Sequence, residues 1–297
     1  MLAKRDVRFY NKDMKFLLFI FGVIWMNVLS NRTNYEFSEA AYQKAFINVV
    51  QSVTRNVALK KNHAVLFLGA QPGAGKSTFC NMDNNFTDYI IINGDNYRIH
   101  HPYYREIVMQ DKERMAELTQ SFVNRVVEDL IRELSKEGYN LIIEGTLRDP
   151  QVPIRTGNML KEQGYTTELY VIGCNACISW ESTISRAKLM EEVGQSPRLV
   201  PIEKYDKIVN NLVESLKKIE ASHCMDRITI ISRDSKILWK ENDEKRAGTA
   251  SVALDKVLDV AEWNSRYQEF KIQYDEFVNK VQQENVRIAV CRKKGGR

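Results

Sequence analysis

The chain has 297 residues, of which 44% are hydrophobic, so it can bury one sizeable α/β core with room for further segments at its ends. Its formal net charge of +5 is small and lies mostly near the two ends, which argues against a nucleic-acid-binding protein. The five cysteines are an odd set without paired metal-ligand spacing, which is typical of a reducing compartment. We therefore expect a cytoplasmic protein without a nucleic-acid partner.

An apolar segment at residues 16–26 follows several basic residues, as in a secretory signal. It is shorter than the ~20 residues that a membrane-spanning helix needs, and no small-residue cleavage site follows it. We interpret residues 1–30 as an N-terminal extension that is non-native or dispensable, with Met26 as an alternative start. Membrane attachment is the less favoured alternative.

Runs of β-branched and other apolar residues alternate with helix-like stretches along the rest of the chain. The predicted strands are 64–69, 89–93, 140–145, 168–173 and 227–232, and the predicted helices are 38–59, 77–84, 112–137, 151–163, 178–192 and 201–222. Continuous apolar runs indicate strands that are buried on both faces, as in a parallel sheet. The predicted fold class is α/β, a doubly wound parallel sheet of about five strands flanked by helices, with ligands at the carboxyl ends of the strands.

A glycine-rich turn follows the first predicted strand, in the run AVLFLGAQPGAGKST at residues 64–78. Backbone N–H groups of such a turn bind phosphate oxygens, while Lys76 reaches the β and γ phosphates and the Ser77 hydroxyl is a ligand of Mg²⁺. The first position of the motif G-x-x-x-x-G-K-[ST] is Ala70, which requires an ordinary backbone conformation there. We expect the chain to bind a nucleoside triphosphate with Mg²⁺. A P-loop alone does not distinguish a switch, a motor and a small-molecule kinase. The expected nucleotide-binding residues are Gly73, Ala74, Gly75, Lys76, Ser77 and Thr78.

A carboxylate, Asp95, comes directly after the second predicted strand. The carboxyl ends of parallel strands meet at the edge where the P-loop opens, so Asp95 could accept a proton from a hydroxyl that attacks the γ-phosphate. A structural role for Asp95 in a turn or at a helix N-terminus is the alternative.

The third predicted strand ends with Glu144, followed by Gly145 and Thr146. Glu144 and Thr146 are two residues apart and would point the same way on an extended chain, which suits the binding of a hydroxylated acceptor. Glu144 could instead act through Mg²⁺ and its waters, and the sequence leaves both roles open.

Two arginines, Arg186 and Arg198, bracket a segment that contains Gly194 and Pro197. On a lid over the nucleotide their guanidinium groups could neutralise charge on the transferred phosphoryl group. A solvated position on the helix surface is the alternative for either arginine.

The C-terminal part, 251–297, is predicted to be a long helix with a basic tail, following a kinase domain at 31–250. Its aromatic residues and Val281 recur at alternating four- and three-residue steps and so form one stripe of the helix. We expect this stripe to pack on the core, and a partner-binding face is the alternative. The stripe consists of Trp263, Tyr267, Phe270, Tyr274, Phe277 and Val281.

These motifs together resemble the zeta toxin family of bacterial toxin–antitoxin systems. The resemblance extends from about residue 35 to about residue 245 and is carried by AQPGAGKS, by NGDNYR followed by HHPYY, by GYNLIIEGTLR followed by VP, and by the later arginine pair. It implies a cytoplasmic kinase that uses ATP and Mg²⁺ to phosphorylate the 3′-hydroxyl of the amino sugar in UDP-N-acetylglucosamine, which blocks peptidoglycan synthesis. It also implies a small antitoxin protein that covers the nucleotide site.

Position by position, the resemblance makes Asp95 the catalytic base, assisted by Lys76, Arg186 and Arg198. The substrate-binding residues expected from it are Asp95, Arg98, Glu128, Glu144, Thr146 and Arg148. The chain departs from the family in the lid, where Arg186-Ala187-Lys188 replaces an R-Y-E run and the loop to Arg198 is one residue shorter.

Two other functions fit the same residues. One is a P-loop kinase for another UDP-sugar or small alcohol, such as a nucleoside, an aminoglycoside or a shikimate-like compound. The other is a non-catalytic nucleotide-binding module whose aromatic C-terminal helix recruits a partner. A carboxylate at the position of Asp95 favours a kinase, because a pure binder does not need a base beside the acceptor.

Overall fold

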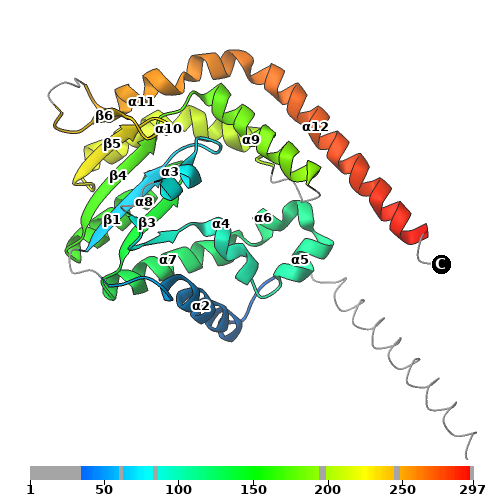
Figure 1. Cartoon of the computed structure of the whole chain (residues 1–297), viewed down its shortest axis with the longest axis horizontal. Coiled ribbons are helices and arrows are strands. Elements are labelled where there is room, and N and C mark those ends of the chain that lie inside the picture. The colour runs from blue at the N-terminus through cyan, green and yellow to red at the C-terminus, as the bar shows by residue number, and fades with distance from the viewer. Residues whose placement is uncertain (1–34, 60–62, 83–85, 194–198, 244–247, 295–297) are drawn as a thin grey trace, which may run out of the picture. The chain divides into compact units, whose positions relative to one another are not determined.

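The computed structural model describes residues 35–59, 63–82, 86–193, 199–243 and 248–294, so the predicted extension at residues 1–30 lies outside the described residues. The strands of the described part form one six-stranded sheet in the order β2-β3-β1-β4-β5-β6 (Figure 1). Its strands are β1 Ala64–Gly69, β2 Tyr89–Ile92, β3 Asn140–Gly145, β4 Thr166–Ile172, β5 Arg227–Ile231 and β6 Ile237–Lys240. Strands β1 to β5 are parallel, which confirms the predicted α/β class.

Strand β6 pairs antiparallel with β5 at the edge of the sheet and was not predicted. Of its four residues, the structure buries Trp239 and leaves Ile237 and Leu238 exposed. A short edge strand with one buried side chain has neither an alternating nor a continuous apolar pattern, so the sequence carried no signal for it.

The helices of the described part largely agree with the predicted ranges. They are α2 Glu39–Thr54, α3 Lys76–Met82, α4 Gly94–Tyr97, α5 Tyr104–Gln110, α6 Met115–Leu118, α7 Gln120–Lys136, α8 Gln151–Glu162, α9 Ala176–Glu192, α10 Ile202–Ser222, α11 Ala250–Leu258 and α12 Val260–Lys294, with 3₁₀ turns η2 Arg98–His100 and η3 Lys112–Arg114. Helices α4 and α5 were not predicted. The predicted C-terminal helix is divided into α11 and α12 by Asp259, whose φ of 51° is left-handed.

The prediction of one helix over 112–137 was wrong, because the structure breaks it at Thr119. In a continuous helix the N–H of Gln120 would bond to the carbonyl of Ala116. Here Arg98 Nη1 donates to that carbonyl at 2.9 Å and to Thr119 Oγ1 at 2.8 Å. The guanidinium of Arg98 is therefore bound at the end of α6. No local sequence pattern reveals this contact.

The described chain divides into two compact units, one formed by residues 35–52 and 94–129 and the other by the remaining residues. The first unit has an aromatic core in which the rings of Phe37, Tyr42 and Phe122 contact one another. Tyr42 donates to Asp129 Oδ2 at 2.5 Å, and the guanidinium of Arg125 lies 3.7 Å from the Tyr42 ring centroid. These contacts join α2 to α7 within the unit.

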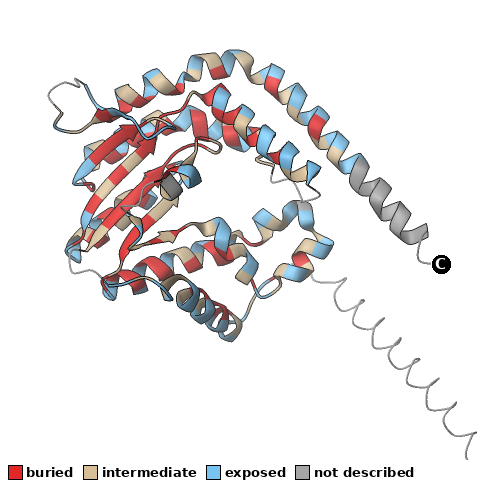
Figure 2. Cartoon of the chain, in the orientation of Figure 1, coloured by how far each residue is buried: buried red, intermediate tan, exposed pale blue. Residues whose placement is uncertain are grey.

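The second unit contains the whole sheet, and every strand of the sheet carries buried residues (Figure 2). Alternate residues of β1, among them Leu66 and Leu68, pack with Phe79 of α3 on one face. The packing on this face extends to Ala70 and Ala74, so the loop between β1 and α3 is anchored directly in the core.

An aromatic cluster joins α9, α10 and α12 in the second unit. Trp263 of α12 is fully buried and contacts Trp180 of α9 and Tyr205 of α10, and its Nε1–H donates to Asp206 Oδ1 at 2.9 Å. Phe270, two turns further along α12, is also buried. The predicted aromatic stripe therefore packs on the core.

Candidate functional site

The loop between β1 and α3 has the backbone that a phosphate-binding loop requires. Gly73 and Gly75 adopt left-handed φ values of 80° and 104°, which a residue with a side chain rarely accepts. Ala70 is buried and does not have a positive φ, so alanine is compatible with the first position of the motif. Lys76 Nζ donates to the carbonyls of Ala70 and Gln71 at 2.7 and 3.2 Å. The ammonium group of Lys76 is therefore held against the backbone of the phosphate-binding loop.

The remaining predicted nucleotide-binding residues begin α3. Thr78 N–H donates to the Gly75 carbonyl at 3.0 Å, which forms the first turn of the helix, and the side chains of Ser77 and Thr78 are exposed. The N–H groups of a helix's first turn have no acceptor within the helix, so they are suited to phosphate oxygens.

Residues of helix α9 pack against the phosphate-binding loop. A Cβ on Gly73 would lie 2.0 Å from the carbonyl oxygen of Ser179 and 2.8 Å from the methyl group of Thr183. Gln71 is fully buried, and its Nε2 donates to Ser179 Oγ at 3.0 Å and to the Cys174 carbonyl at 2.7 Å. The loop thus depends on residues about a hundred positions later in the sequence, which the motif alone could not reveal.

Ser179 also links α9 to α10. Its hydroxyl and that of Tyr205 are 2.5 Å apart, and the Tyr205 hydroxyl donates to the Ala176 carbonyl at 2.7 Å. Burial raises the pKa of Tyr205, so its hydroxyl stays protonated and acts as a donor. Helix α9 is therefore fixed between the phosphate-binding loop and the aromatic cluster.

Arg186 lies on the face of α9 that contacts the loop. It is seven residues after Ser179 and three after Thr183, the spacing that places side chains on one face of a helix. Its side chain is exposed. This arrangement is compatible with the predicted role of Arg186, whereas Arg198 lies outside the described residues.

Glu144 is held by hydrogen bonds at the end of β3. Asn93 Nδ2 donates to Glu144 Oε2 at 2.9 Å, and Cys80 Sγ lies 3.7 Å from Oε1. Burial, with the charge of Glu144 in second place, raises the pKa of the Cys80 thiol to about 12. Cys80 is one turn after Ser77 in α3, so Glu144 is next to the helix that carries the predicted metal ligand.

The chain turns shortly after β3. The strand ends at Gly145, one residue before Thr146. Leu147 has a φ of 53° and fills the space beside Gly69, where a Cβ would lie 2.3 Å from its Cδ1. Thr146 is half-buried and Arg148 is exposed on either side of this turn. Their predicted substrate contacts stay predictions.

Three other predicted residues belong to the first unit. Asp95 is in the first turn of α4, its side chain is 63% exposed, and it accepts from Arg98 Nε at 2.9 Å. Arg98 also donates to the Ala116 carbonyl, and this second hydrogen bond fixes the guanidinium that contacts Asp95. Gly94 allows close packing here, because a Cβ would lie 2.8 Å from the side chain of Val123. Glu128 is exposed on α7.

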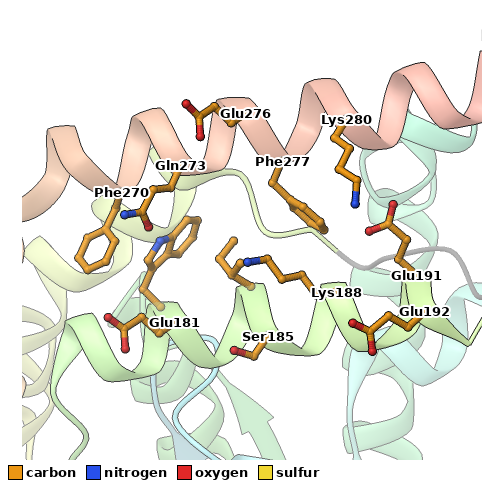
Figure 3. Close-up of a pocket in the computed structure, with 12 residues that line it drawn as sticks. Glu181, Ser185, Lys188, Glu191, Glu192, Phe270, Gln273, Glu276, Phe277 and Lys280 are labelled. Carbon is orange, nitrogen blue, oxygen red and sulfur yellow. The ribbon is translucent and has the colours of Figure 1, made fainter.

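A groove of about 1010 Å³ lies between α9 and α12 (Figure 3). It is lined by Trp180, Glu181, Ile184, Ser185, Lys188, Glu191, Glu192, Phe270, Gln273, Glu276, Phe277 and Lys280. None of the P-loop residues lines it, so it is separate from the phosphate-binding loop.

The described residues contain no cluster of three or more histidine, cysteine or acidic side chains that could hold a metal ion. Cys174 and Cys177 are buried free thiols. Over the same described ranges, no helix is both long and apolar enough to cross a membrane.

Arg233, which comes two residues after the end of β5, was not among the predicted site residues. Its Nε lies 3.9 Å from the place where a Cβ of Gly75 would stand. A polar residue at the carboxyl end of a predicted parallel strand is the signal that could have found it.

The model of the zeta toxin family matches residues 48–244. Toxin PezT of Streptococcus pneumoniae is 32% identical over 232 residues, covering 77% of this chain and 90% of PezT. Toxin zeta of Streptococcus pyogenes is 27% identical over 206 residues, covering 68% of this chain and 72% of that toxin.

A solved structure from the PezAT chromosomal toxin–antitoxin system of Streptococcus pneumoniae superimposes with a TM-score of 0.68 at 29% identity, covering 84% of this chain and 98% of that one. The resemblance inferred from the motifs is thereby confirmed, and the chain belongs to the zeta toxin family.

Proposed function

We propose that this chain is the toxin of a toxin–antitoxin system and acts as an ATP-dependent kinase that phosphorylates the 3′-hydroxyl of the amino sugar in UDP-N-acetylglucosamine. The observation that carries the proposal is the phosphate-binding loop, whose glycines have left-handed backbones and whose Gly73 packs against α9. Membership of the zeta toxin family supports a phosphotransferase that acts as a toxin.

In this mechanism the chain binds the triphosphate and prepares the acceptor. Lys76 and the N–H groups of Gly75 to Ser77 bind the β and γ phosphates. Asp95 accepts the proton of the acceptor hydroxyl as its oxygen bonds to the γ-phosphorus, while the bond from that phosphorus to the β–γ bridging oxygen breaks and ADP leaves. Arg186 and Arg198 stabilise the negative charge on the transferred group.

The residues at the end of β3 fit a bound Mg²⁺. Carboxylate and hydroxyl oxygens are its usual protein ligands, and Asn93 orients Glu144 next to the helix that begins with Lys76 and Ser77. Ser77 would bind the ion directly and Glu144 through water. When bound, Mg²⁺ neutralises charge on the β and γ phosphates.

The proposed protein partner is inferred from the relatives of this chain. The pneumococcal relative comes from a toxin–antitoxin system, so we propose that a small antitoxin protein binds this chain and covers its nucleotide site. The proposed compartment is the cytoplasm, which supplies ATP and UDP-sugars.

The test is phosphoryl transfer to a panel of UDP-sugars, nucleosides and shikimate-like alcohols with ATP and Mg²⁺, followed by mass spectrometry. We expect UDP-N-acetylglucosamine to gain one phosphoryl group. Asp95→Asn should lower kcat by roughly 10²–10⁴ because it removes a positioned base. Glu117→Gln is the matched control, since Glu117 is an exposed acid of the same unit that pairs with Arg114. Transfer to a different alcohol would favour another small-molecule kinase, and ATP binding without transfer to any acceptor would favour a non-catalytic module.

A further inference from the structure

Arg233 lies beside the phosphate-binding loop in space although it is far from it in sequence. β1 and β5 are parallel and separated only by β4, so their carboxyl ends meet at one edge of the sheet. Arg233 Nε is 3.9 Å from the position of a Cβ on Gly75, and no other described atom outside that glycine's chain neighbours comes within 4 Å of that position. The guanidinium thus lies next to an otherwise open side of the loop.

A hydrogen bond fixes where the guanidinium points. Arg233 Nη1 donates to Ser182 Oγ at 3.1 Å, and Ser182 is three residues after Ser179, the α9 residue whose carbonyl lies against Gly73. Arg233 is therefore attached to the same helix face that supports the loop.

The turn that carries Arg233 is ordered by its own contacts. Ser232 Oγ donates to Asp234 Oδ1 at 2.5 Å, the Ser232 N–H donates to the Lys236 carbonyl at 2.8 Å, and Ser235 adopts a left-handed φ of 63°. An ordered turn presents an arginine at a lower entropic cost than a flexible loop would.

Among the described residues, Arg233 has no acidic partner that neutralises its charge. Asp234, the adjacent carboxylate, pairs with Lys236 Nζ at 2.6 Å. Within the described residues, no carboxylate forms an ion pair with Arg233. A planar guanidinium without an acidic partner, next to a loop built for phosphate, matches a polyanionic ligand.

We propose that Arg233 binds the phosphate chain of the nucleotide, as a contact supplied by the loop after β5 in addition to the P-loop lysine. This inference rests on the ATP binding in the proposed function and adds a residue to that site. It assigns Arg233 to binding of ADP as well as ATP, because Gly75 is in the part of the loop that precedes Lys76 and cradles the inner phosphates.

The test is nucleotide affinity, measured by calorimetry without any acceptor, for the full chain and its Arg233→Ala and Arg233→Lys variants. Loss of a charge-assisted hydrogen bond should weaken ATP and ADP roughly tenfold or more, and lysine should restore part of the affinity because it keeps the charge. Arg227→Ala is the matched control, since Arg227 is exposed at the opposite end of β5 and pairs with Glu168 at 2.8 Å.

The outcomes separate this inference from the proposed function. If the unmodified chain binds ATP and Arg233→Ala binds ATP and ADP within twofold of it, the assignment of Arg233 is wrong and the kinase proposal is unaffected. If the unmodified chain binds neither nucleotide, both proposals are overturned. A loss in Arg227→Ala equal to that in Arg233→Ala would also overturn the assignment, because it would reflect net charge alone.

Discussion

Substitution of Gly73 by alanine tests how the phosphate-binding loop is held. The new methyl group would lie 2.0 Å from the carbonyl oxygen of Ser179, whereas ordinary carbon–oxygen contacts begin at about 3.3 Å. The oxygen belongs to the backbone of α9, so it cannot rotate away as a side chain could. Either the loop or the helix must therefore shift by about 1 Å or more.

The expected cost has two parts. Alanine in a left-handed conformation costs about 1–2 kcal/mol, because its Cβ approaches the following carbonyl. Forcing an extra carbon into a packed site adds about 1–3 kcal/mol. Gly164 offers a matched control, since its φ of 84° is similar to the 80° of Gly73, but no described atom outside its chain neighbours lies within 4 Å of its Cβ position. Gly164→Ala should therefore show only the first part.

The measurement is the free energy of unfolding in urea, followed by tryptophan fluorescence, with and without ATP. We expect Gly73→Ala to be less stable than Gly164→Ala by about 1–3 kcal/mol, and to lose stabilisation by ATP because the loop that binds phosphate is displaced. Equal stabilities of the two variants would refute the contact between the loop and α9.

Two further predictions concern the interiors of the two units. In the second unit, Trp263→Ala should lower the free energy of unfolding by about 3–5 kcal/mol because it empties a fully buried site, while Trp263→Phe keeps a ring and should lose less; equal urea midpoints for the two variants would contradict this. In the first unit, burial lowers the pKa of His101 from 6.5 to about 4. Below pH 6.5 the unfolded chain then binds a proton that the folded chain excludes, so stability should fall between pH 6.5 and 4. His101→Gln should flatten that slope in urea titrations at several pH values, and an unchanged slope would show that other groups cause it.

The sequence by itself determined the structural elements that a local pattern of residues specifies. Continuous β-branched runs predicted the five parallel strands, because a strand buried on both faces must be apolar along its whole length. The run from Gly73 to Ser77 predicted the phosphate-binding loop, since left-handed backbone positions select glycine directly. The aromatic stripe from Trp263 to Phe277 predicted a packed helix because its helical period is visible in the chain.

Only the tertiary structure decided which distant residues meet these local elements. The helical pattern is interrupted at Thr119 because Arg98 donates a hydrogen bond to the Ala116 carbonyl. Gly73 packs against Ser179, which belongs to a helix about a hundred residues later in the chain. Arg233 reaches the loop because the parallel sheet brings the ends of β1 and β5 to one edge. Such contacts join residues that the chain itself separates, and their energies depend on the packing of the whole sheet and its helices. A periodic pattern records which face of an element is buried, but it does not record which partner covers that face.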